Sequence, residues 1–127
     1  MDLKDYFENN QGLGVLSTAD AEGNVNAAVY SRPHFMEDGA LAFIMPDRLT
    51  HRNLTTNPHA AYLFRENGPG YKGKRLYLAK IREEADGELV DALRRKVYPP
   101  EVEEKFGPRS VVIFTIEKVL PLVGTGE

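Results

Sequence analysis

Cysteine is absent from this chain of 127 residues. Its absence excludes a disulfide framework, a thiolate nucleophile and any cysteine-ligated metal or iron–sulfur cluster. Histidine is scarce as well, and His34, His51 and His59 are expected at a strand end, in a helix and at a strand start. No two of them have the i, i+4 spacing of metal ligands on a helix, so we do not expect a zinc site.

Strong charge and long apolar runs are also missing. The formal net charge is −3, so an electrostatic nucleic-acid footprint is not expected. No apolar run approaches the length of a membrane span, and the charged start Met1–Asp5 lacks the apolar core of a signal peptide. The length fits one domain. We predict a single-domain, soluble, cytoplasmic protein.

Familiar catalytic motifs are missing too. The sequence contains no GxSxG nucleophile elbow, no P-loop, no HExxH zinc motif and no Rossmann glycine fingerprint. Its paired carboxylates, Glu83–Glu84 and Glu103–Glu104, fit solvated helix faces. The sequence therefore assigns no nucleophile and no general acid or base.

Short β-prone runs separated by turn residues dominate the chain. The predicted helices are residues 2–10, with Leu3, Tyr6 and Phe7 on one face, Glu83–Val97, and the short piece Glu101–Phe106. The predicted strands are Leu13–Ala19, Val25–Met36 with a bulge or edge at Pro33, Ala40–Met45, Ala60–Arg65, Leu76–Ile81 and Ser110–Val119. Six strands joined by hairpin turns predict a mainly β (α+β) fold, built as a closed antiparallel barrel.

The stretch Pro46–Pro58 lies between two apolar strands and predicts a helix of about two to three turns. Asp47 is the expected cap, and Asn57–Pro58 is the expected end because a residue before proline avoids the helical region. The first turn carries Arg48, Thr50, His51 and Arg52. Cations and a hydroxyl at a helix start favour an anion, with phosphate the expected one. A solvated surface helix explains the same spacing equally well.

Neighbouring strand segments lead into this helix. Val29–Arg32 pairs by hairpin with the strand that ends at Phe43–Met45, and that strand continues directly into the basic turn. A flat aromatic ligand bearing a phosphate fits this arrangement, with the phosphate at the helix start and the ring along the strand ends. The arrangement is coherent with such a ligand without being unique to it.

The order of these segments resembles the FMN-binding split β-barrels, which include pyridoxamine 5'-phosphate oxidase and small bacterial flavin-binding proteins. The segments that carry the resemblance are AAVYSRPHF, LAFIMP, DRLTHRNLTTNP, HAAYLFRE and GKRLYLAK. By element order it covers about Gly12 to Ile116, and it is strongest over Val29–Phe64. The resemblance implies a six-stranded antiparallel split β-barrel with flanking helices. It also implies an FMN cofactor and a homodimer with FMN in the subunit interface.

The resemblance further implies which residues bind the cofactor. These are Val29, Tyr30 and Ser31 at the ring and ribityl chain, Phe43 and Ile44 beside the ring, Arg48, Leu49 and Thr50 at the opening of the phosphate-binding helix, and Arg75 at the ring edge. Family members usually carry cations where Leu49 and Thr50 stand. Part of the phosphate charge must therefore be met by Arg48, His51 or Arg52.

The chain also departs from the full oxidase. Its C-terminal VLPLVGTGE lacks the Arg-x-His pair that grips the vitamin phosphate, so pyridoxamine phosphate oxidation is disfavoured. The implied function is an FMN-dependent oxidoreductase with an unknown small-molecule or redox-protein donor and acceptor. A non-catalytic flavin carrier, a haem- or deazaflavin-binding barrel and a cofactor-free dimeric structural protein stay open. Haem would need His34, His51 or His59 as its axial ligand.

Overall fold

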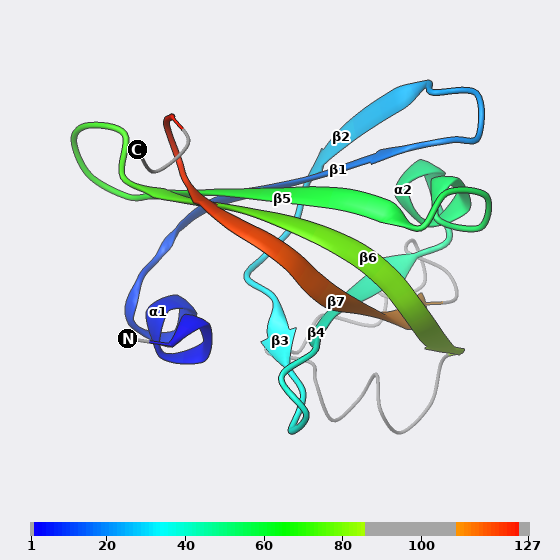
Figure 1. Cartoon of the computed structure of the whole chain (residues 1–127), viewed down its shortest axis with the longest axis horizontal. Coiled ribbons are helices and arrows are strands. Elements are labelled where there is room, and N and C mark those ends of the chain that lie inside the picture. Colours follow the sequence, from blue (N-terminus) through cyan, green and yellow to red (C-terminus); the bar gives the residue numbers. More distant parts are fainter. Residues whose placement is uncertain (1, 86–108, 125–127) are drawn as a thin grey trace, which may run out of the picture.

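An antiparallel sheet carries the fold. The computed structural model describes residues 2–85 and 109–124. Within them the sheet has seven strands in the order β2-β1-β5-β6-β7-β4-β3 (Figure 1). The elements are α1 (Leu3–Asn9), β1 (Gly12–Ala19), β2 (Val25–Val29), β3 (His34–Phe35), β4 (Leu41–Pro46), α2 (Leu49–Asn53), β5 (His59–Glu66), β6 (Gly73–Ala85) and β7 (Arg109–Pro121). Figure 1 shows α1 and α2 near opposite ends of the long strands. The predicted mainly β fold with flanking helices is confirmed.

The segment between β1 and β4 differs from the single long strand that the sequence predicts. β2 ends at Val29 and β3 contains only two residues, so Tyr30–Pro33 leaves the ladder. Pro33 has no N–H to donate, and it restricts the residue before it. The predicted strand Val25–Met36 is therefore two strands, which gives seven in the described residues instead of six. In those ranges β2 pairs only with β1 and β3 only with β4, so the sheet is split at this point and not closed.

β6 is much longer than predicted. It runs through Ala85, and Glu83, Glu84 and Ala85 pair with β7. The predicted start of a helix at Glu83 is therefore wrong, because ladder pairing with the strongly β-prone β7 overrides the helical pattern there. The rest of that predicted helix, residues 86–97, and the helical piece at 101–106 lie outside the described residues.

Aromatic side chains fill the space that the sheet encloses. Phe43 on β4 lies with its ring centroid 5.1 Å from that of Tyr62 on β5 and 6.0 Å from that of Phe114 on β7. All three are buried. As the sequence predicts, α1 buries Tyr6 and Phe7, whose rings meet Phe64 edge-on. These contacts hold β4, β5 and β7 together around one core beneath the site described below.

The helix α2 is shorter than predicted. It spans five residues, Leu49–Asn53, and its cap residue is Arg48, which makes no side-chain capping bond. The predicted cap, Asp47, instead places its carboxylate 3.2 Å from the His51 ring. A helix this short has little dipole to offer an anion, so positive charge near it must come from side chains.

Two side-chain hydrogen bonds, one buried and one part-buried, fasten α2 to the sheet. Asn26 Nδ2 on β2 donates to Thr50 Oγ1, and Asn53 Nδ2 donates to Thr18 Oγ1 on β1, each over 3.1 Å. Thr18 and Asn26 are themselves opposite each other in the β1–β2 ladder. Asn53 and Leu54 are buried, as expected for packing positions. The β1–β2 hairpin therefore anchors one side of α2.

Candidate functional site

A cleft of about 900 Å³ opens between β2, the segment Tyr30–His34, β4 and the start of α2. Eight of the eleven residues that the sequence assigns to cofactor binding line it: Val29, Tyr30, Ser31, Phe43, Ile44, Arg48, Leu49 and Thr50. Its volume lies in the range of small-molecule and cofactor sites. Residues far apart in the sequence thus meet around one concave surface.

Apolar and aromatic side chains form one wall of the cleft. Phe43 is buried, and its ring lies 5.9 Å from the Tyr30 ring at an interplanar angle of 86°. Val29 and Leu49 also line the cleft, yet they are 71% and 54% exposed, which is high for such side chains. Exposed apolar surface of this kind is typical of a place where a ligand or a partner binds.

Hydrogen bonds with β5 and β1 hold the segment that bears Tyr30 and Ser31 in place. The hydroxyl of the buried Tyr62 lies 3.3 Å from the Tyr30 carbonyl oxygen and 3.0 Å from that of Ser31, and it donates to both. The Tyr30 N–H donates to the Gly14 carbonyl over 3.0 Å. This part of the cleft wall is therefore irregular in backbone conformation but firmly positioned.

Thr50 faces the cleft but is committed to protein partners. It is 3% exposed, accepts the hydrogen bond from Asn26 and is hydrogen-bonded to the Tyr30 hydroxyl. Burial raises the pKa of Tyr30, and the Thr50 hydrogen bond offsets part of that rise. Tyr30 is therefore a neutral phenol at pH 7 and does not act as a base. Thr50 positions this wall, whereas the sequence suggested a hydrogen bond to phosphate.

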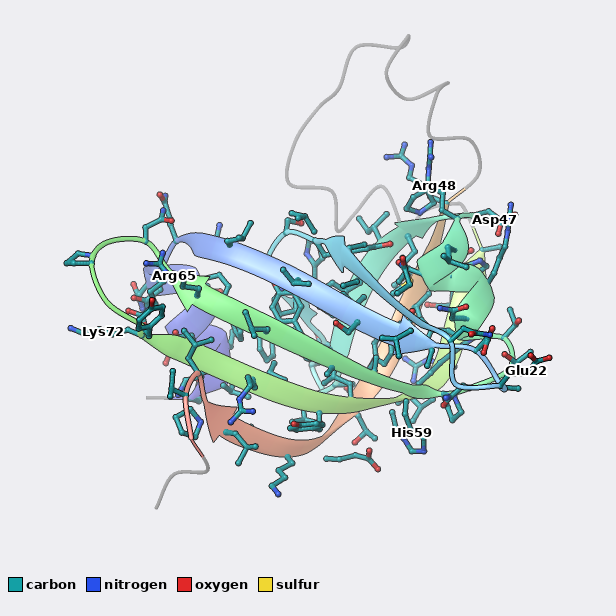
Figure 2. The ribbon with its side chains drawn as sticks, turned by 90° about the horizontal axis from the view of Figure 1, so that it is seen from above. Glu22, Asp47, Arg48, His59, Arg65 and Lys72 are labelled. Atoms are coloured by element: carbon teal, nitrogen blue, oxygen red, sulfur yellow. The ribbon has the colours of Figure 1, made fainter. Side chains whose placement is uncertain are left out.

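Two arginines from different elements line the β4–α2 end of the cleft. Arg109, the first residue of β7, is paired with Pro46, and the Arg48 N–H donates to the Pro46 carbonyl over 2.9 Å. Both arginines line the cleft. Figure 2 shows Arg48 beside Asp47 at this edge of the molecule. Arg109 supplies a second cation near the position where Leu49 and Thr50 lack one.

Other polar residues of the cleft also escaped prediction from the sequence. Asn26 comes from β2, Arg32 from the segment that leaves the ladder, and His34 is the first residue of β3. Arg32 Nη1 donates to the Phe7 carbonyl oxygen over 2.6 Å, which ties that segment to α1. The alternation of β2 would have indicated Asn26, since its neighbours Val25 and Ala27 are exposed.

Three of the predicted residues do not line the cleft. Arg52 is exposed and lies 3.8 Å from Asp47, measured from Nε to Oδ1. Arg75 donates from Nε to the Pro121 carbonyl over 3.0 Å and from its guanidinium to the Gly124 carbonyl. His51 binds two carboxylates, described below. His51 and Arg52 are both drawn to Asp47, in the turn before α2, and so lie outside the cleft that Arg48, Leu49 and Thr50 line.

The histidines bear on the haem alternative. His51 has carboxylate oxygens at both ring nitrogens, and His59 lies on the surface 3.6 Å from Glu117. Neither lines the cleft, whereas His34 does. Among residues 2–85 and 109–124, no three histidines, aspartates or glutamates are grouped so that they could hold a metal ion. None of the helices in these ranges has the length and apolarity needed to cross a membrane.

Comparison with known proteins gives the family. The family described as pyridoxamine 5'-phosphate oxidase matches residues 3–122. The chain belongs to this family. A search of curated proteins finds no match. The fold found above is thus the split barrel of the pyridoxamine 5'-phosphate oxidase family, with the cleft beside the split between β2 and β3.

Solved structures share the fold at low identity. An FMN-binding protein from Syntrophomonas wolfei subsp. wolfei is 24% identical with a TM-score of 0.72, covering 93% of this chain and 82% of that one. HupZ from Group A Streptococcus is 20% identical with a TM-score of 0.68, covering 94% and 90%. A FAD-binding protein from Mesorhizobium loti is 18% identical with a TM-score of 0.53, covering 86% and 82%.

Proposed function

We propose that this member of the pyridoxamine 5'-phosphate oxidase family binds FMN in the cleft and acts as an FMN-dependent oxidoreductase. The observation that carries the proposal is the cleft itself, where a buried aromatic wall and two arginines from β7 and the β4–α2 turn face one cavity of about 900 Å³. The names of two structures with this fold, an FMN-binding and a FAD-binding protein, support a flavin as the ligand.

The lining residues fit the two parts of FMN. Phe43 and Ile44 offer an apolar surface to a flat ring, and Val29, at the end of the edge strand β2, brings backbone groups near its polar edge. Arg48 and Arg109 bring positive charge to a phosphate, and arginine is well suited to bind it through two parallel hydrogen bonds. The residues of the cleft thus match a ligand with an aromatic end and an anionic end.

With FMN bound, the site would gain the flavin's reversible acceptance of hydride or electrons. The chain's own residues bind, orient and shield. Tyr30 stays protonated at neutral pH, and the wall formed by Phe43 and Ile44 limits the access of water to whatever lies against it.

The visible absorption spectrum tests this proposal. Purified protein is mixed with FMN, passed through a gel filtration column and scanned from 300 to 600 nm (roughly the flavin and haem range). We expect a two-banded flavin spectrum that elutes with the protein. A Soret band in the protein as purified would instead favour haem, with His34 as the lining histidine. A colourless protein that does not retain FMN would overturn the flavin proposal.

Turnover separates an oxidoreductase from a flavin carrier. The FMN-loaded protein is mixed anaerobically with a nicotinamide donor, and a flavin or dye acceptor is then added. We expect repeated cycles of reduction and reoxidation faster than those of the same concentration of free FMN. Equal rates for bound and free FMN would leave the protein a carrier.

We further propose a homodimer that uses the outer face of β2, β1 and β5. Val29, Val15 and Leu63 lie directly opposite one another across these strands, so their side chains share one face. Leu13 on β1 and Val25 on β2 are 51% and 76% exposed. A row of exposed apolar side chains on a sheet face is typical of a protein interface. Arg75 is opposite Leu63 on this face. In a dimer built on this face, Arg75 of each copy would therefore lie at the interface, near a cofactor bound there.

Replacing Leu63 with lysine should convert the dimer to a monomer, because two buried ammonium groups would then lie in the interface. Analytical ultracentrifugation measures the change. The matched control is Tyr71→Lys, an exposed loop position outside the face, which should leave the dimer intact. A Leu63→Lys protein that sediments as the wild type does would contradict this choice of interface.

A further inference from the structure

His51 joins α2 to β6 through two carboxylates. Its Nδ1 lies 3.2 Å from Asp47 Oδ1, in the turn before α2, and its Nε2 lies 2.9 Å from Glu83 Oε2 on β6. The other oxygen of Glu83 accepts from Lys80 Nζ over 2.5 Å. The His51 side chain is only 15% exposed. Polar contacts therefore link Asp47, which is next to Arg48 at the edge of the cleft, through His51 to Glu83 and Lys80 on β6.

The two hydrogen bonds of His51 can form together only when both ring nitrogens carry a proton. A carboxylate only accepts hydrogen bonds, and a neutral imidazole carries a single N–H. The imidazolium can therefore donate to Asp47 and Glu83 together. On deprotonation one bond is lost, and a nitrogen lone pair then faces a carboxylate oxygen, which is repulsive.

The charges around His51 agree with this geometry. Burial opposes its charged form, but the hydrogen bonds and negative charges of Glu83 and Asp47 outweigh burial and raise the pKa of His51. Hydrogen bonds from Lys80 and His51 lower the pKa of Glu83, so it stays anionic at neutral pH. Arg52 lies near Asp47, and the hydrogen bonds that join α2 to β1 and β2 involve the neutral Thr18 and Asn26.

We propose that protonated His51 is a positioning residue, which ties α2 to β6 and thereby holds Arg48 and Leu49 at the cleft. It is not a phosphate ligand. Because the raised pKa belongs to the folded state, the tie is fully formed at acidic pH and is lost as pH rises through that pKa. The affinity of the cleft for its ligand should fall over the same pH range. This last consequence rests on the proposed binding of FMN, whereas the tie itself does not.

The tie is tested without any ligand. The amide of Arg52 donates to the Arg48 carbonyl over 2.9 Å, so its protection from hydrogen exchange reports on the first turn of α2. We expect the protection factor, corrected for the intrinsic rate at each pH, to fall about two- to fivefold between pH 6 and pH 8.5, the range measured for exposed ion pairs. His51→Gln should show a low, pH-independent protection factor. Protection in the wild type that does not change with pH would overturn the proposal.

His59→Gln is the matched control, because His59 also lies beside a carboxylate, but that carboxylate, Glu117, belongs to β7 and not to the contact between α2 and β6. It should keep the wild-type pH profile. Should His51→Gln fail to fold, Glu83→Gln removes the negative charge and leaves the imidazole. Its amide can accept from a protonated Nε2 or donate to an unprotonated one, so this variant should flatten the same profile. A steep wild-type profile that survives in Glu83→Gln would contradict the role of β6.

Ligand affinity separates this proposal from the proposed function. Riboflavin is the probe, because the FMN phosphate loses its own second proton at about pH 6 and so adds an opposite trend. Riboflavin has no phosphate for Arg48 to bind, so its affinity reports on the position of Leu49 in the cleft wall. In the wild type this affinity should fall about two- to fivefold from pH 6 to pH 8.5, and that of His51→Gln should stay constant. If no flavin binds but the protection of the Arg52 amide changes with pH as expected, the proposed function is wrong and the contact between α2 and β6 stands. Identical profiles in both proteins would sink the positioning role and keep the function.

Discussion

Alanine at Arg48 should weaken the binding of FMN by about 10- to 100-fold, because a charge-assisted hydrogen bond contributes about 1.5–3 kcal/mol. Arg48 lines the β4–α2 end of the cleft, whereas the apolar wall lies at Phe43 and Ile44. The loss should therefore concern the phosphate and not the ring. Riboflavin, which lacks the phosphate, should bind Arg48→Ala within about twofold of its wild-type affinity. Quenching of flavin fluorescence measures both dissociation constants.

Arg52→Ala is the matched control for Arg48→Ala. Arg52 is four residues further along the same segment, but its side chain is exposed and lies by Asp47, outside the cleft. Its removal should leave FMN affinity unchanged, and Arg109→Ala should behave as Arg48→Ala does. Equal losses of FMN and riboflavin in Arg48→Ala would contradict a phosphate site. An unchanged FMN affinity would contradict it as well.

Replacing Gly14 with alanine should destabilise the protein by about 3 kcal/mol, because the new methyl group has no space. A Cβ at this position would overlap the Tyr62 hydroxyl and come within 2.6 Å of the Tyr30 carbonyl oxygen. Tyr62 is fully buried among aromatic rings, so it cannot move aside without opening the core. Displacing its hydroxyl also breaks the bonds that hold Tyr30 and Ser31 at the cleft.

Urea denaturation measures this effect, and Ser17→Ala is its control. Ser17 lies on the same strand, points away from the core and should change stability by no more than about 0.5 kcal/mol. We expect the Gly14→Ala protein, where it still folds, to have lost flavin affinity together with stability. An unfolding midpoint equal to that of the wild type would show that Tyr62 is not held as the structure indicates.

Local patterns in the sequence predicted most of the strands. Runs such as Leu13–Ala19 and Ala60–Arg65 alternate buried and less buried side chains and end within one residue of β1 and β5. Their period identifies a strand regardless of what pairs with it. Elements that depend on pairing were predicted less well. Glu83 lies on a helix-like pattern, yet it joins β6 because Val112 on β7 is there to pair with it.

The candidate site shows the same division. The eight lining residues that the sequence identified lie in three short contiguous segments before, within and after β4, so the family resemblance could place them. Arg109 could not be placed in this way, because only the register of β4 with β7 brings it to Pro46. His51 was assigned to phosphate because its segment is basic. The structure instead puts it between two carboxylates, one of them on a strand 32 positions away.

A crystal structure of the protein grown with FMN tests the central claim most directly. The account predicts FMN in the cleft, with its ring against Phe43 and Ile44 and its phosphate within hydrogen-bond distance of Arg48 or Arg109. FMN bound elsewhere on the chain would contradict it. A cleft that stays empty in crystals of protein that binds FMN in solution would contradict it equally.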